Sequence, residues 1–293
     1  MRSPSRSEQL PRLAGAVGLV LVAFAVAGPQ LTGATLTSSA DVSSAPIQAG
    51  TWSTGNAYPA AVAATTPLPV DVLNLSEQPP VTFISDTGSR GATAVASGSA
   101  LGWGATGLLI GDTDTALSFD GDASGKPYVR TGGPATNAPT DVTVAAWVSV
   151  TGPGRLVGFG DSATGGSTDE DRVLYVDDAG FLRAAVRDSG GAVTAVQSDN
   201  PIVGASHHVA FSLGSNGLLL YVDGTLQTGS SASTTSAKAY TGWWRIGWDS
   251  LPTDYPGLGS ADELVTGTVD EVAVWEAQLS GTDIAALAAA NHP

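Results

Sequence analysis

Three acidic clusters are the first residues to test for hydrolytic chemistry: Asp169-Glu170-Asp171, Asp262-Glu263 and Asp270-Glu271. Hydrolysis of a glycosidic bond uses two carboxyl groups, one as the acid and one as the nucleophile or base. On a strand these groups belong at positions i and i+2, because side chains alternate between faces. The first two clusters lie in Gly/Ser-rich stretches that predict loops, and the adjacent acids of the third predict opposite faces. We therefore predict no catalytic pair and expect a protein that is not an enzyme.

Other nucleophiles and metal ligands are scarce. No serine stands in a Gly-x-Ser-x-Gly elbow before a helix, and the absence of cysteine excludes a thiol nucleophile, a disulfide and a thiolate zinc site. His207 and His208 are adjacent, and on a regular strand two neighbouring rings point to opposite faces and cannot chelate one ion. We expect these histidines to pack in the core or to form a hydrogen bond with a neighbouring loop.

The densest aromatic stretch runs over residues 240–249 and continues through residues 254 and 255. Aromatic faces stack on the CH groups of sugars, and neighbouring Asp or Arg side chains can fix hydroxyl groups. Trp244, Ile246 and Trp248 alternate and are expected to face the core, because alternation on a strand separates two faces. A glycan platform on the remaining side chains is the functional hypothesis for this stretch: Trp243, Arg245, Asp249, Asp254 and Tyr255.

Charge excludes two classes of partner. The chain has 27 acidic and 12 basic residues and a formal net charge of −15. A surface this negative repels nucleic acid phosphates and anionic lipid headgroups. Charged residues make up only 13% of the chain and hydrophobic residues 42%, a combination that predicts an ordered protein.

The sequence predicts that the elements that position these residues are strands. After Val81, short β-type runs alternate with turns of Gly, Asp and Asn, and no helical period separates them. Residues 142–150 are the clearest run, with five small or branched residues on one face: Val142, Val144, Ala146, Val148 and Val150. Strands spaced about ten residues apart predict an all-β, two-sheet antiparallel sandwich or jelly roll. One short helix is predicted at the C-terminus, where Ser280 and Asp283 form a capping box before an apolar run.

The N-terminus predicts export. Residues 1–12 have a basic excess, residues 13–28 are an unbroken apolar run, and small residues follow at positions 32–34. These are the three parts of a secretory signal peptide, which we assign to residues 1–34. The run is shorter than the roughly 20 residues of a spanning helix, and no second apolar run follows, so we expect no membrane insertion after the signal and a secreted or cell-surface protein.

Residues 35–78 are rich in Pro, Ala, Thr and Ser and predict an extended, irregular linker. Residues 79–293 would form the folded domain. Directly after the signal, the segments ATLTSSADV and IQAGTW resemble the mature start of proteins processed by SipW-type signal peptidases, a group that includes camelysin-like biofilm components. The alternative is a plain spacer after an ordinary signal.

Four motifs carry a family resemblance: GDTDTALSFDG at residues 111–121, TVAAW at 143–147, HHVAFSL with GLLLYVDG at 207–224, and GTVDEVAVW with Leu279-Ser280 after residue 267. In this order they resemble the laminin-G-like domains of the concanavalin A-like superfamily. Two departures stand out. The family usually has a Trp shortly before the histidine pair, where this chain has Ala205-Ser206, and its opening strand has no clear counterpart near residues 81–86.

The resemblance implies a two-sheet antiparallel jelly roll and, in many relatives, one structural calcium ion at the edge of a sheet. By that resemblance Asp270 is the leading ligand and Asp120 a second one. Calcium takes oxygen ligands in irregular geometry, which an acidic, turn-rich chain can supply. The alternative is that both carboxylates cap turn amides.

We therefore expect an exported, non-catalytic domain that binds a carbohydrate or a cell-surface or matrix protein. A structural component of an extracellular matrix or biofilm is the alternative, supported by the N-terminal resemblance and the linker. A concanavalin A-like glycosidase comes third, because the fold hosts such enzymes.

Overall fold

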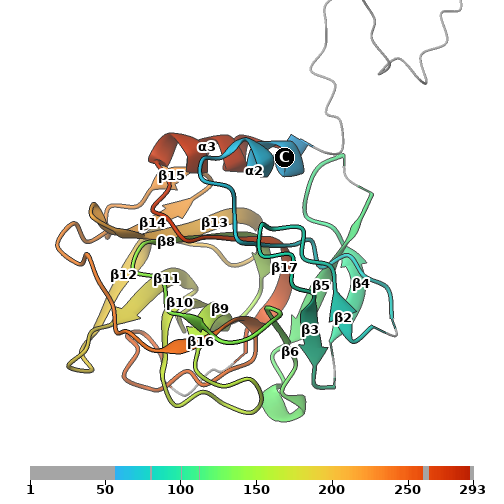
Figure 1. Ribbon diagram of the computed structural model, residues 1–293, viewed down its shortest axis with the longest axis horizontal. Helices are drawn as coiled ribbons and strands as arrows, with labels where there is room; N and C mark the ends of the chain where they lie inside the picture. Colours follow the sequence, from blue (N-terminus) through green and yellow to red (C-terminus); the bar gives the residue numbers. More distant parts are fainter. Residues whose placement is uncertain (1–56, 80, 100, 112, 260–263, 291–293) are drawn as a thin grey trace, which may run out of the picture. The chain divides into compact units, whose positions relative to one another are not determined.

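Two antiparallel sheets face each other across an apolar core in the computed structural model (Figure 1). The structure describes residues 57–79, 81–99, 101–111, 113–259 and 264–290. This architecture confirms the predicted all-β jelly-roll fold. The expectations for the signal peptide and for the SipW-type resemblance fall on residues outside these ranges.

The eight-stranded sheet has the spatial order β15-β14-β13-β8-β17-β5-β4, with β1 paired to β17 beside this path. Its strands are β1 (Asp71–Leu73), β4 (Gly102–Thr106), β5 (Thr115–Asp120), β8 (Val142–Val150), β13 (Ser206–Gly214), β14 (Gly217–Val222), β15 (Thr225–Leu226) and β17 (Thr266–Trp275).

The nine-stranded sheet has the order β12-β11-β10-β9-β16-β6-β3-β2, with β7 paired to β16. Its strands are β2 (Phe83–Ile84), β3 (Ala94–Ser97), β6 (Tyr128–Arg130), β7 (Thr136–Asn137), β9 (Gly154–Gly160), β10 (Glu170–Val176), β11 (Phe181–Arg187), β12 (Val193–Pro201) and β16 (Thr241–Gly247). A 3-10 turn, η1 (Ala123–Gly125), precedes β6.

Alternation on β8 and β16 builds the core between the sheets. The five residues of β8 predicted to share one face are all buried there: Val142, Val144, Ala146, Val148 and Val150. Trp244, Ile246 and Trp248 lie in the same core and are at most 4% exposed, as their spacing predicted. Burial of apolar surface stabilises a fold by about 25 cal/mol per Å², so this core is the main source of stability.

Two helices cover the outer face of the eight-stranded sheet, as Figure 1 shows. The helix α3 (Gly281–Ala289) begins at the predicted capping box, in which Ser280 accepts from the backbone of Asp283 and the Asp283 side chain accepts from the backbone of Ser280. Its residues Ile284 and Leu287 join Trp147 and Trp275 in a second apolar cluster. The predicted C-terminal helix is therefore present and has a packing role.

The second helix, α2 (Ala57–Ala64), lies within the segment that we expected to be an irregular linker. Tyr58 and Val62, four residues apart, are buried against the outer cluster, and β1 follows and pairs with β17. The expectation is wrong for residues 57–78, because Pro59 lies in the first turn of α2, where no intrahelical N–H bond is lost. The compact unit that contains α2 runs from residue 53 to residue 293, so its start lies before the expected domain boundary at residue 79.

Candidate functional site

A bulge in β17 brings two adjacent acids to the same side of the strand. Asp270 pairs with Trp147 and Ala273 pairs with Ala145, so β17 has two residues opposite one residue of β8. Glu271 is the extra residue and has a φ of 51°, in the left-handed region. The expectation that Asp270 and Glu271 point to opposite faces is therefore wrong, because it assumed a regular strand.

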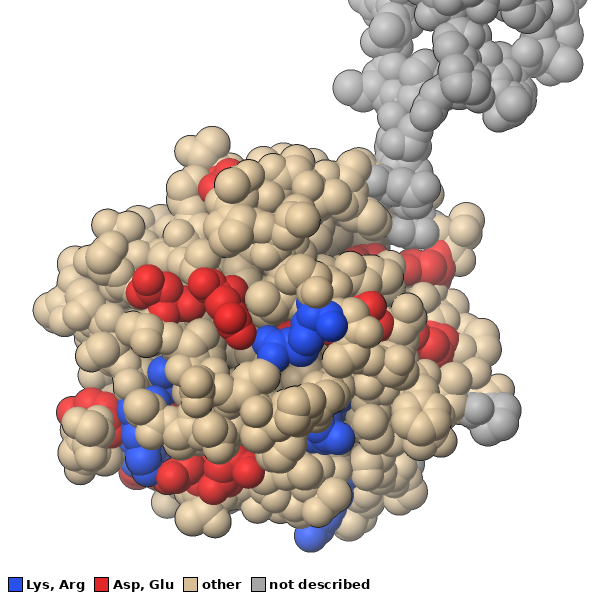
Figure 2. Space-filling model, viewed as in Figure 1, with Lys and Arg blue, Asp and Glu red and all other residues tan. Residues whose placement is uncertain are grey.

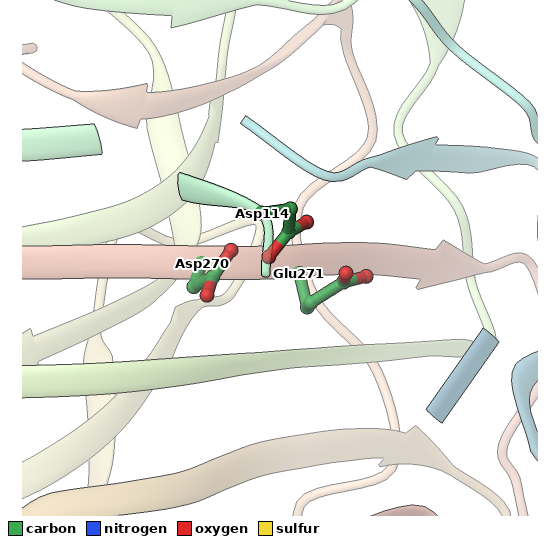
Figure 3. Close-up of side chains that lie close together, drawn as sticks. All are labelled: Asp114, Asp270 and Glu271. Carbon is green, nitrogen blue, oxygen red and sulfur yellow. The ribbon is translucent and has the colours of Figure 1, made fainter. Parts of the chain in front are cut away.

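Asp114, from the loop before β5, completes an acidic cluster with these two residues (Figure 3). Each residue offers one carboxylate oxygen, and these oxygens lie within 4.8 Å of one another. Asp270 Oδ2 accepts from the backbone N–H of Leu108 at 2.9 Å, and Glu271 Oε1 accepts from Asn74 Nδ2 at 3.3 Å. Oxygen donors of this kind suit a hard cation such as calcium.

The cluster affects Tyr58 of α2. Burial raises the pKa of its phenol well above the usual value, and the charges of Glu271 and Asp270 raise that pKa further. The Tyr58 phenol is therefore expected to stay neutral at every physiological pH.

Asp120, the other expected calcium ligand, does not belong to this cluster. Asp120 pairs with Thr266 of β17. Thr266 precedes Asp270 by four residues, and four residues span about 13 Å along a strand. Asp120 is exposed, and its Oδ1 accepts from the backbone N–H of Asp122 at 2.9 Å. Asp120 therefore caps a turn amide, which was the alternative to calcium binding. Asp114 is the residue that lies beside Asp270.

A cavity of about 410 Å³ lies next to Glu271, between α2, residues 68–74 and residues 87–89. Its walls are mainly apolar, from Val62, Leu68 and Val72, with Asn74 beside the carboxylate. Sequence reasoning missed this hollow, because it treated the residues that form two of its walls as linker.

The expected glycan platform divides into buried and open parts on the outer face of the nine-stranded sheet. Trp243 is partly exposed, and its indole N–H donates to the carbonyl of Gly133 at 3.0 Å. The guanidinium of Arg130 lies over the Trp243 ring, 5.1 Å from its centroid.

Arg245 and Asp249 are fully buried and cannot contact a ligand on this surface. Arg245 donates from Nη1 to the carbonyl of Gly165 at 2.7 Å and lies 3.3 Å from Asp249. Asp249 accepts from the backbone and the hydroxyl group of Ser167 at 2.7 and 2.8 Å. These two residues fix loop 161–169 on the sheet, so the expected exposure of Arg245 is wrong, and Asp249 does not have the expected position of a ligand-binding residue.

Tyr255 is also buried, and it anchors loop 249–259 on the same face. Its hydroxyl group donates to Glu170 Oε2 at 3.0 Å, and burial raises the pKa of Glu170 to about 8. Asp254, which is exposed, accepts two hydrogen bonds from Arg187 at 2.7 and 3.1 Å. Tyr255 and Asp254, which were expected to contact a ligand, therefore hold loop 249–259 against the sheet.

The acidic cluster at residues 169–171 enters β10 instead of a loop. Asp171 is buried, where it accepts from Arg172 Nη1 at 2.5 Å and from the Tyr240 hydroxyl group at 2.9 Å. Burial raises its pKa, and its charged partners lower it again in part. The residues Asp262 and Glu263 lie outside the described ranges.

The histidines take the roles expected for them. His208 is buried between Trp147 and Tyr58, with ring centroids 5.6 and 5.9 Å away. The Nδ1 atom of His207 lies 2.8 Å from Asp223 Oδ2. The two rings have separate surroundings and form no common metal site.

A row of four neighbouring side chains at the other end of this face is exposed or partly exposed: Phe83, Val95, Arg130 and Trp243. Phe83 pairs with Val95, Val95 with Arg130, and Arg130 with Arg245, two residues from Trp243. Phe83 is 64% exposed, and the other three are partly exposed. The row crosses β2, β3, β6 and β16 and is about 14 Å long, at about 4.8 Å per strand. We call these four residues the open row.

Acidic side chains form several separate groups on the surface shown in Figure 2, with basic side chains among them. The helices of the described ranges are too short and too weakly apolar to cross a bilayer.

This fold and these motifs define the class of protein. The profile of the concanavalin A-like lectin/glucanases superfamily matches residues 122–285, and the chain belongs to this family. A search of curated proteins found no match.

Among solved structures, the chain is similar to the binding domain of Paraclostridial Mosquitocidal Protein 1, with 11% identity and a TM-score of 0.55 over 75% of this chain and 51% of that one. It is also similar to Trypanosoma rangeli sialidase in complex with a difluoro-KDN compound, with 16% identity and a TM-score of 0.51 over 75% of this chain and 32% of that one. The chain thus matches about half of the first protein and a third of the second. At these identities the likeness concerns the fold.

Proposed function

We propose that this protein is an exported, non-catalytic binding domain that recognises a carbohydrate or a cell-surface or matrix protein. The open row carries the proposal, because Trp243 and Phe83 offer aromatic surface on a rigid sheet. The Trp243 indole is held by its bond to Gly133, so little rotamer freedom is lost when a ligand binds. The binding domain of Paraclostridial Mosquitocidal Protein 1 has a similar fold, which supports a binding role.

The covered centre of the same sheet argues for binding without hydrolysis. A pair of catalytic carboxyl groups must reach both sides of a scissile bond. On this sheet, Glu170 lies beneath Tyr255, and Asp249 lies beneath loop 161–169. A sugar chain could not cross the centre of the face without removal of both loops.

Calcium is the proposed cofactor, held by Asp114, Asp270 and Glu271. The donor set fits: three carboxylates converge within 4.8 Å, and two of them are buried. Buried charges of one sign destabilise each other, and a divalent cation would offset this cost. The ion would join the loop before β5 to the bulge of β17 and would have a structural role.

Binding can be tested with a glycan array and a panel of matrix proteins, with the full-length protein in calcium and in chelator. We expect Trp243→Ala to weaken binding about tenfold or more, since a large aromatic contact is lost. Leu226→Ala is the matched control, an exposed apolar residue on β15 of the other sheet. Equal binding by both variants would contradict the proposed surface.

Two further readouts separate the alternatives. Self-assembly of the purified protein without any ligand would favour a structural role in an extracellular matrix or biofilm. Release of reducing sugar from an array hit would favour a glycosidase. Recovery of the protein from the medium or the cell surface, and not from lysed cells, tests export.

A further inference from the structure

Most basic side chains of this acidic protein are already neutralised by a carboxylate. Within the described ranges, the following residues have an acidic oxygen within 4.0 Å: Arg90, Arg155, Arg172, Arg183, Arg187, Lys238 and Arg245. Arg130 and Lys126 are the exceptions in this part of the chain. An arginine without an acidic partner in a chain of charge −15 is a candidate for binding an external anion.

Arg130 is also shaped to bind such an anion. Its Nη1 donates to the carbonyl of Thr131 at 3.0 Å, and the guanidinium lies over the Trp243 ring. The contact with Trp243 and this bond restrain the guanidinium, and none of its nitrogen atoms is buried without a hydrogen-bond partner. A planar guanidinium held in this way binds a carboxylate through two parallel hydrogen bonds.

The neighbours of Arg130 in the open row are apolar. Val95 is the cross-strand partner of Arg130, and the exposed Phe83 is the partner of Val95. Adjacent strands are about 4.8 Å apart. The ring of a sugar could therefore lie with its CH groups on Val95 and Phe83 while a substituent on the ring reaches Arg130.

We infer that the open row binds a sugar that carries a carboxylate, with Arg130 as the partner of that carboxylate and Phe83, Val95 and Trp243 as the apolar contact surface. This inference rests on the proposed binding function and specifies its ligand class. The overall negative charge opposes a densely charged polyanion such as a nucleic acid. The ligand therefore carries isolated carboxylates, as in a sialic acid or a hexuronic acid.

Lys126 provides a matched control. It has no acidic partner and lies over an indole, 5.0 Å from the centroid of Trp248. It is the C-cap residue of η1, four residues before Arg130, and is outside the open row. Lys126→Gln therefore makes the same change in net charge as Arg130→Gln without removing the proposed partner of the carboxylate.

The test is calorimetric titration of the full-length protein with two pairs of probes: 3′-sialyllactose against lactose, and digalacturonic acid against its dimethyl ester. We expect one acidic probe to bind about tenfold or more tightly than its neutral counterpart, the range of a charge-assisted hydrogen bond. Arg130→Gln removes this preference, Arg130→Lys keeps part of it, and Lys126→Gln leaves it intact. The acidic probe that binds identifies the source of the carboxylate.

Other outcomes overturn the inference and leave the proposed function separately testable. If the protein binds acidic and neutral probes with equal affinity, and Arg130→Gln does not change these affinities, the face binds sugars without a preference for a carboxylate. Equal losses in Arg130→Gln and Lys126→Gln indicate a general electrostatic effect. Binding of none of the four probes also contradicts the inference, whereas the proposed function then depends on the array result for Trp243→Ala. Melting temperatures of all variants show whether each one is folded.

Discussion

Asp270 and Glu271 are consecutive residues of a strand, and yet both carboxylates lie close to each other and both act on the buried Tyr58. The bulge at Glu271 makes this possible, because an extra residue in the left-handed conformation shifts the alternation by one position. A non-glycine residue in that region is strained by about 1–3 kcal/mol. The strand therefore accepts both backbone strain and charge repulsion at one point, and a bound cation would offset the repulsion.

Calcium is expected to stabilise the protein through this cluster. At a concentration 100-fold above its dissociation constant, a ligand adds about 2.7 kcal/mol, which corresponds to a rise of about 5–10 °C in the melting temperature of a domain of this size. Asp270→Asn should lose most of the rise, because it removes one of the three charges. Differential scanning calorimetry in calcium and in chelator measures this.

Asp120→Asn is the control for that experiment, since it makes the same chemical change in an exposed turn. It should retain the full calcium effect. A wild-type melting temperature that is the same in calcium and in chelator would rule out the ion.

Asp249 is expected to have a structural role. Asp249→Ala would leave the buried guanidinium groups of Arg245 and Arg155 without their carboxylate. Removal of one partner from a buried ion pair costs about 3–5 kcal/mol. Urea denaturation should show a loss of this order in the free energy of unfolding.

Asp254→Ala is the comparison for Asp249→Ala, because Asp254 pairs with Arg187 at the surface, where such pairs contribute about 0–1 kcal/mol. If both substitutions had equally small effects, Asp249 would not fix loop 161–169 as we describe.

Much of the fold was predictable because its signals are local. The alternation in residues 142–150 and the capping box at Ser280 lie within a few residues of the elements they specify. The site depended on distant contacts. Asp249 is buried by Ser167, 82 positions away in the sequence, and the bulge at Glu271 depends on its pairing with β8. No pattern of residue types near either position shows these contacts.

The pH dependence of stability should reflect Glu170. Its pKa is about 8 in the folded protein and 4.5 in the unfolded chain, so the folded state binds more protons between these values. The stability that Glu170 contributes is therefore present at low pH and is lost as the pH rises from about 4.5 to 8. The upper limit of this change is about 5 kcal/mol.

Glu170→Gln keeps a neutral hydrogen-bond acceptor for Tyr255 and should flatten the pH profile of the unfolding free energy in that window. Asp71, whose pKa burial raises to about 7, will leave a residual slope. Identical profiles for the variant and the wild type, measured by denaturation at pH 5, 6, 7 and 8, would contradict the neutral state of Glu170.

The helix α2 is expected to be part of the folded domain and not a spacer. Tyr58 is fully buried against Trp147 and His208, with ring centroids 6.5 and 5.9 Å away. Tyr58→Ala should cost about 3 kcal/mol or more, since truncation of a buried aromatic side chain leaves a cavity. Ala60→Ser, on the exposed side of the same helix, should change stability by less than about 0.5 kcal/mol. If residues 57–64 were only a spacer, both variants would unfold at the same denaturant concentration as the wild type, and a chain that begins at residue 79 would be as stable as one that begins at residue 53.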